Sequence, residues 1–84
     1  MTKVNLVESL NQLVRIYERQ LVRLDVIERY SYKDPRHIDA DVELRELNRK
    51  FMEIVDRVRD DYDDDVLSLL LNAAEHIFTL KVGE

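Results

Sequence analysis

The fold depends on residues 60–80, which read DDYDDDVLSLLLNAAEHIFTL. Five of the first six positions are acidic, and the run that follows is mostly apolar. Aspartate is unfavourable inside a helix and like charges one turn apart repel, so the acidic segment favours a break. Aspartate also caps helix N-termini well, which favours a new helix starting close to residue 64. We therefore expect two helices here, at about 35–61 and 64–81.

The alternative is one continuous helix, because the apolar positions keep their phase across the acidic segment. No glycine or proline interrupts residues 58–80. The chain would then form a long antiparallel helical hairpin instead of a three-helix bundle. The stripe that follows the helical repeat comprises Val58, Tyr62, Val66, Leu69, Ala73, Ile77 and Leu80.

Apolar residues at steps of three and four predict two helices upstream of the acidic segment. The first, at about 5–30, can be capped by Asn5, with Glu8 three residues later as in a capping box. The second can start at Pro35 with Asp34 as its cap, or later with Asp39 or Asp41. The first stripe comprises Leu6, Leu10, Leu13, Tyr17, Leu21, Leu24 and Ile27, and the second comprises Leu44, Leu47, Phe51, Ile54, Val55, Val58 and Tyr62.

The composition fits a single all-α domain over residues 1–84. One glycine, one proline and 37% charged residues suit helices joined by few turns. A domain of this size buries only about 60% of its unfolded surface, and without cysteine it has no disulfides. We therefore expect self-association to add stability. The first residues lack the apolar run of a signal peptide, so we expect a cytoplasmic protein with no membrane contact.

The helix expected at 64–81 has more apolar surface than one face of a small bundle needs. Its polar residues Ser68, Asn72, Glu75 and Thr79 form one narrow stripe. Exposed apolar surface of this kind often marks an interface, although a helix wedged between two others would also need it. The predicted interface with a partner or a second copy comprises Leu67, Leu70, Leu71, Ala74, Ile77 and Phe78.

Charge is distributed unevenly along the chain. Residues 1–33 carry a net charge of +2 and residues 34–84 a net charge of −7, which together give −5. The first helix places Arg15, Arg19 and Arg23 on successive turns, where like charges repel unless something compensates them. We expect either a solvated face or contact with an acidic surface, including this protein's own aspartates. The same arginines could bind a small anionic ligand, but nucleic acid is a poor match for an acidic chain.

The acidic segment allows three interpretations. Its members are Asp60, Asp61, Asp63, Asp64 and Asp65. They can cap and solubilise the helix ends, or they can dock a basic partner. Binding of Mg²⁺ or Ca²⁺ is less well supported, because the segment lacks the spacing, the glycine and the final glutamate of an EF-hand loop.

Two carboxylate pairs, Glu43-x-x-Glu46 and Glu53-x-x-Asp56, resemble motifs of the all-α nucleotide pyrophosphohydrolases of the MazG type. That resemblance implies a divalent-metal-dependent enzyme whose carboxylates converge on Mg²⁺ from facing helices. Here both pairs lie on one predicted helix. Ion pairs along an exposed helix face also explain them, so we expect no catalytic residue, metal or cofactor. The opposite charges one turn apart are Glu46–Lys50, Arg49–Glu53, Glu53–Arg57 and Arg57–Asp61.

Together these features favour a small cytoplasmic protein-binding module that acts as a regulator, inhibitor or adaptor. An apolar helix face would supply affinity, and the flanking arginines and aspartates would set orientation and association rate. The alternatives are the metal-dependent enzyme and the binder of an anionic ligand or nucleic acid.

Overall fold

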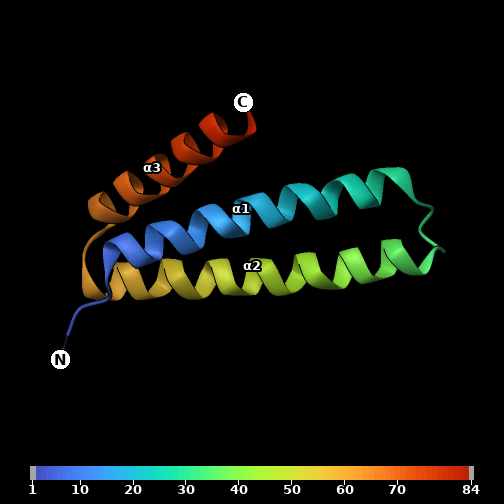
Figure 1. The fold of residues 1–84 in the computed structure, drawn as a ribbon. Helices are drawn as coiled ribbons and strands as arrows, with labels where there is room; N and C mark the ends of the chain where they lie inside the picture. Colours follow the sequence, from blue (N-terminus) through green and yellow to red (C-terminus); the bar gives the residue numbers. More distant parts are fainter. Residues whose placement is uncertain (1, 84) are drawn as a thin grey trace.

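The computed structural model describes residues 2–83, and these residues form three helices and no strand (Figure 1). Helix α1 spans Leu6–Arg29, α2 spans Pro35–Asp61 and α3 spans Asp64–Val82. α1 and α2 form an antiparallel hairpin, and α3 crosses one side of it. The predicted all-α fold is confirmed, and of the two architectures considered it is the three-helix one.

Each helix begins at a residue whose side-chain oxygen accepts a backbone N–H. The oxygen of Asn5 lies 3.1 Å from the amide nitrogen of Glu8, and Asp34 accepts from Arg36 at 2.8 Å. Asp63 accepts from Val66 at 2.9 Å, and α3 starts at Asp64 with two residues between it and the end of α2. These bonds satisfy amide groups that have no partner within the helix itself. An aspartate cap is therefore part of the break between α2 and α3.

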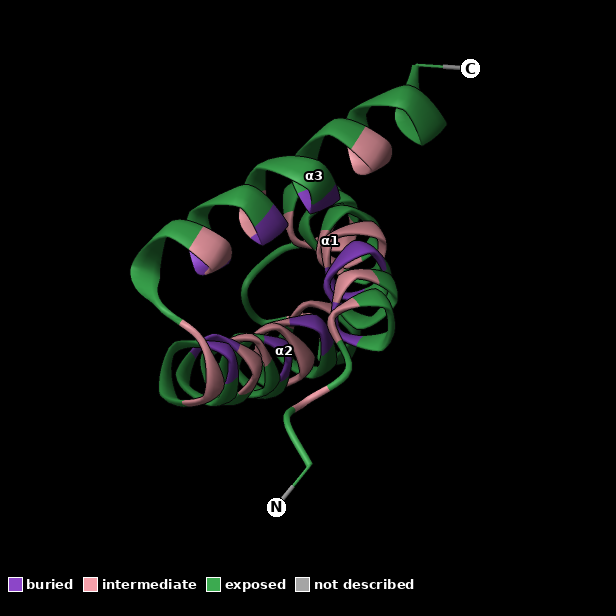
Figure 2. Cartoon of the chain, turned by 90° about the vertical axis from the view of Figure 1, so that its left-hand side faces the viewer, coloured by how far each residue is buried: buried purple, intermediate pink, exposed green. Residues whose placement is uncertain are grey.

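The core lies where α3 covers the hairpin, and Figure 2 shows the buried residues on the inner faces of all three helices. Leu13 of α1 and Val58 of α2 are fully buried. The segment before α1 is tied to the same end of the molecule. The amide of Val4 donates to Asp61 at 2.7 Å, and the hydroxyl of Tyr62 donates to the Val4 carbonyl at 3.1 Å. The joint between α2 and α3 is thus held by the N-terminal segment.

α3 covers only the first part of α1, and it diverges from the hairpin toward its own C-terminus (Figure 1). Near its end, the Lys81 ammonium lies 2.9 Å from the carboxylate of Glu18. α1 continues to Arg29, beyond this contact. As a result Leu21 and Leu24, which the sequence places on the core stripe, are 44% and 48% exposed.

The core side of α3 differs in part from the stripe that the helical repeat predicts. Val66 and Ile77 of that stripe pack against the core, whereas its other members on α3 are exposed. The stripe expected to face the core includes Leu69 and Leu80, which are 70% and 57% exposed. Leu67, Leu70 and Ala74, expected on the outside, are buried against α1 and α2. The joint at Tyr62 and Asp63 leaves the helical backbone conformation, so the phase of α2 does not carry into α3.

Within residues 2–83, none of the three helices has the combination of length and apolar character needed to cross a lipid bilayer.

Candidate functional site

The six residues predicted as an interface are used mostly inside the chain. Leu67, Leu70 and Ala74 belong to the core, and Leu71 and Ile77 pack against it. The ring of Phe78 is partly buried, with its centroid 5.8 Å from that of Tyr17. The interpretation of α3 as a helix that needs apolar contact on this side therefore fits the structure, but the contact is with α1 and α2.

The apolar residues that α3 leaves uncovered lie on its other side. Leu69, Ala73 and Leu80 are separated by four and seven residues, so they share one helical face, and all three are exposed. We call these three residues the outer strip. Its two leucines are far more exposed than their neighbours on the inner side of the helix. The outer strip is therefore apolar surface that the described part of the chain leaves exposed.

The arginine series on α1 is compensated by α2 and not by the acidic segment. Arg19 and Arg23 both form ion pairs with Glu43, and the Nε of Arg19 lies 2.6 Å from its carboxylate. The hydrogen bond from Arg19 lowers the pKa of Glu43 below its ordinary value of 4.5. Arg15 is left out of this cluster. Within residues 2–83, Arg15 is therefore the only one of the three predicted arginines that forms no ion pair.

Glu43 gives a pH-dependent contribution to stability. A carboxylate whose pKa is lower in the folded state stabilises the fold above its unfolded pKa, and this contribution is lost as the pH falls through the folded value. Below pH 4.5, the wild type should therefore lose stability more steeply than Glu43→Gln, by about 1 kcal/mol in total for two partly exposed pairs. Urea unfolding at a series of pH values measures this difference. Glu28→Gln is the matched control, since Glu28 has no ion pair within residues 2–83; an identical slope in all three proteins would contradict the prediction.

The residues of the acidic segment have mainly structural contacts. Asp63 caps α3, and Asp61 accepts the Val4 amide. Asp64 lies 3.3 Å from Arg59, whereas Asp60 and Asp65 are exposed. Among residues 2–83, no group of three or more potential metal-ligating side chains is close enough to hold a metal ion.

Three of the four carboxylates that resemble the pyrophosphohydrolase motifs are engaged with arginines, and the fourth, Asp56, is exposed. Glu43 pairs with Arg19 and Arg23, and Arg49 pairs with both Glu46 and Glu53. These carboxylates do not converge on a common point that a metal could occupy. Their geometry is that of ion pairs along and between helices.

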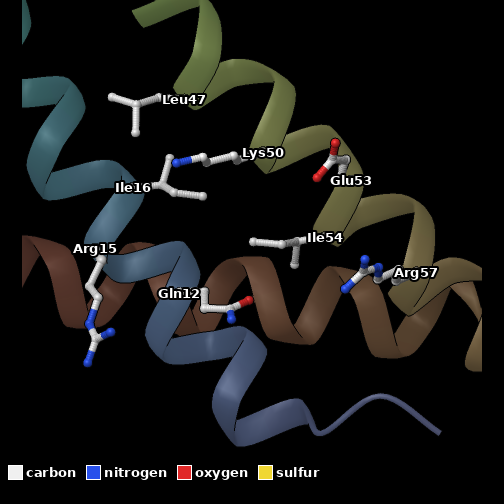
Figure 3. A pocket seen from close by; sticks show the side chains of 8 residues that line it. All are labelled: Gln12, Arg15, Ile16, Leu47, Lys50, Glu53, Ile54 and Arg57. Atoms are coloured by element: carbon white, nitrogen blue, oxygen red, sulfur yellow. The ribbon is translucent and has the colours of Figure 1, made fainter. Parts of the chain in front are cut away.

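An open groove of about 420 Å³ lies between α1 and α2 (Figure 3). α3 passes behind the hairpin in this view, so the groove opens on the other side of the hairpin. Its floor is apolar, with Ile16 and Leu47 buried and Ile54 partly buried. The polar side chains that line it are Gln12 and Arg15 from α1, and Lys50, Glu53 and Arg57 from α2.

The cations of this groove differ from all the others in the chain. Of 13 lysines and arginines, all within residues 2–83, eight form ion pairs and two more, Lys3 and Lys33, lie over tyrosine rings. The remaining three are Arg15, Lys50 and Arg57, and all three line the groove. The fourth charged residue of the lining, Glu53, is paired with Arg49. The groove therefore has an uncompensated positive charge.

The sequence did not identify this groove. It predicted ion pairs of Lys50 with Glu46 and of Arg57 with Glu53 and Asp61, and these three pairs are absent among the described residues. The fourth predicted pair, Arg49–Glu53, is present. Arg49 binds both glutamates, and among the described residues Lys50 and Arg57 form no ion pair. Only the spacing of Arg57 and Lys50, two turns apart on one helix face, is a signal that the sequence could have offered.

No protein-family model matches the chain, and no match was found among curated proteins or solved structures. The function is therefore inferred from the geometry of the outer strip and of the groove.

Proposed function

We propose that the chain is a small protein-binding module, acting as a regulator, inhibitor or adaptor, and that the outer strip of α3 contacts the partner. The observation that supports this proposal is the exposure of Leu69, at 70%, and Leu80, at 57%, on one face of the most apolar helix. Scattered exposed leucines are common, but Leu69 and Leu80 lie on the same helix face, roughly 16 Å apart with Ala73 between them, so one partner surface can cover both.

The surroundings of the outer strip suit a protein interface. Asp65, Asn72 and His76 are exposed and border it on one side by helical spacing. Interfaces of this type combine a central apolar contact, which supplies affinity, with a polar border that sets orientation and association rate. A second copy of the chain is one such partner, because burying the strip would add to the small core of an 84-residue domain.

Charged substitutions in the strip test this proposal. The double variant Leu69→Glu, Leu80→Glu should lose bound partners, because charge is depleted at the centre of interfaces. Immobilised wild-type chain should retain specific proteins from a lysate that the double variant does not retain. If the partner is a second copy, light scattering should show a dimer for the wild type and a monomer for the double variant. The matched control is Ser68→Glu, Thr79→Glu, which adds the same charge to the exposed polar side of α3. Equal retention by all three proteins, each folded by circular dichroism, would contradict the role of the strip.

A further inference from the structure

The groove between α1 and α2 is the second surface with unexplained properties. A chain with 18 acidic residues and a net charge of −5 has enough carboxylates to pair every cation. Within residues 2–83, five cations nevertheless have no carboxylate partner. Lys3 and Lys33 lie over tyrosine rings, and the other three all line the same groove. Cations that line one groove repel one another, and bringing a negative charge into the groove relieves that repulsion. The charge of the groove therefore matches an anionic ligand.

The shape and the apolar floor of the groove indicate which class of anionic ligand fits it. Ile16, Leu47 and Ile54 give it an apolar centre. Arg15 lines the α1 side, with its guanidinium directed away from α2 (Figure 3). Lys50 and Arg57 extend from α2 toward α1 in this view. A simple inorganic anion would pair with the cations but would leave the apolar floor exposed to solvent. A ligand that fits both parts has apolar groups in its middle and carboxylates at its sides.

The length of the groove fits a helix. Leu47 and Arg57 lie ten residues apart on α2, so the lining covers about 15 Å, or nearly three helical turns. Two adjacent antiparallel helices offer a shallow channel into which the side chains of a third helix can pack. An amphipathic helix lying there places apolar residues at steps of three and four on the floor, with its flanking residues near the cations.

We propose that the α1–α2 groove binds an acidic amphipathic helix of a partner protein, whose carboxylates pair with Arg15, Lys50 and Arg57. This inference rests on the proposed function, because it specifies the chemistry of one partner surface. The bound helix lies on the side of the hairpin opposite α3, which gives the complex a four-helix arrangement around α1 and α2. The outer strip stays free, so the two surfaces act independently.

A designed peptide tests the groove directly. The probe is a stapled helix of about 14 residues, roughly 21 Å long, with leucines on one face and glutamates on both flanks of that face. Fluorescence anisotropy of the labelled probe measures its Kd for the wild type and for the triple variant Arg15→Gln, Lys50→Gln, Arg57→Gln. We expect the Kd to rise about tenfold or more in the variant, since three exposed ion pairs are lost. The Kd for wild type should also rise as salt increases from about 0.1 M to 1 M, because screening shortens the range of these attractions.

Three controls make the result specific. The variant Arg29→Gln, Lys33→Gln, Arg45→Gln removes the same charge from cations outside the groove and should bind the probe as the wild type does. A probe with glutamine in place of glutamate should bind weakly. A single-stranded oligonucleotide should bind weakly as well, because the apolar floor offers nothing to phosphates.

The outcomes distinguish failure of the groove inference from failure of the proposed function. The inference is overturned if both triple variants bind the probe equally, if the glutamine probe binds as tightly as the acidic one, or if the oligonucleotide is preferred. It is also overturned if the groove variant loses only self-association and the wild type never binds the probe, because a second copy is then the occupant. The double variant at Leu69 and Leu80 should keep full probe binding, so failure of the outer strip and failure of the groove give different results.

Discussion

Leu70→Glu should unfold the chain at room temperature, whereas Leu69→Glu should leave it folded. The two leucines are adjacent on α3, but Leu70 is 8% exposed in the core and Leu69 is 70% exposed. Burying a carboxylate without a partner carries a penalty of several kcal/mol, which is comparable to the whole stability of a small domain. Thermal unfolding followed by far-UV circular dichroism should show a cooperative transition for Leu69→Glu and none for Leu70→Glu.

This pair of variants also decides how α3 is oriented. The chemical change is the same in both, and only the side of the helix differs. If Leu70→Glu kept a cooperative transition and Leu69→Glu lost it, the core side of α3 would be the one that the helical phase of α2 predicts. A folded Leu70→Glu that is monomeric where the wild type is oligomeric would instead place Leu70 at a surface between copies.

The second large effect is expected at the centre of the hairpin. Leu13→Ala should lower the free energy of unfolding by about 2–5 kcal/mol, because Leu13 is fully buried and its truncation leaves a cavity among α1, α2 and α3. The matched control on the same helix is Leu21→Ala. Leu21 is 44% exposed, so its truncation should have an effect below about 1 kcal/mol.

Urea unfolding curves of the two variants and the wild type measure this contrast. The midpoint should shift strongly to lower urea for Leu13→Ala and only slightly for Leu21→Ala, with similar slopes for all three proteins. Similar losses at both positions would mean that α3, or a second copy, covers Leu21 in solution.

The sequence predicts the helices well because each one has local signals. Asn5, Asp34 and Asp63 are cap residues whose side chains need only the next turn of backbone to form their bonds. Pro35 follows its cap as the first residue of α2. The break after α2 is also local, since five acidic residues disfavour a continuous helix whatever surrounds it.

The orientation of α3 is not a local property. Helical spacing shows which residues share a face, but a helix with apolar residues on two sides has two candidate core faces. The choice depends on the direction in which the chain leaves α2. Tyr62 and Asp63 depart from helical backbone angles, and this change of direction turns Leu67, Leu70 and Ala74 inward.

The candidate sites depend on which of several possible ion pairs each charged side chain forms. Arg49 can reach a glutamate on either side along α2, and it binds both. Glu43 has arginines within reach across the hairpin, and it binds Arg19 and Arg23. The ion pairs formed by Arg49 and Glu43 decide which cations of the groove stay unpaired. The unpaired set therefore follows from the packing of α1 on α2 and not from spacing within one helix.

The shortness of the two connections has a consequence for the order of folding. Five residues join α1 to α2 and two join α2 to α3, so neighbouring helices meet after closing loops that form in well under a microsecond. The contacts between α1 and α3 instead join distant parts of the chain, as in the Lys81–Glu18 pair. α3 also packs on α2 less extensively than on α1. We therefore expect the hairpin to form first and α3 to dock last, which makes the helix with the outer strip the first to detach when the native state opens.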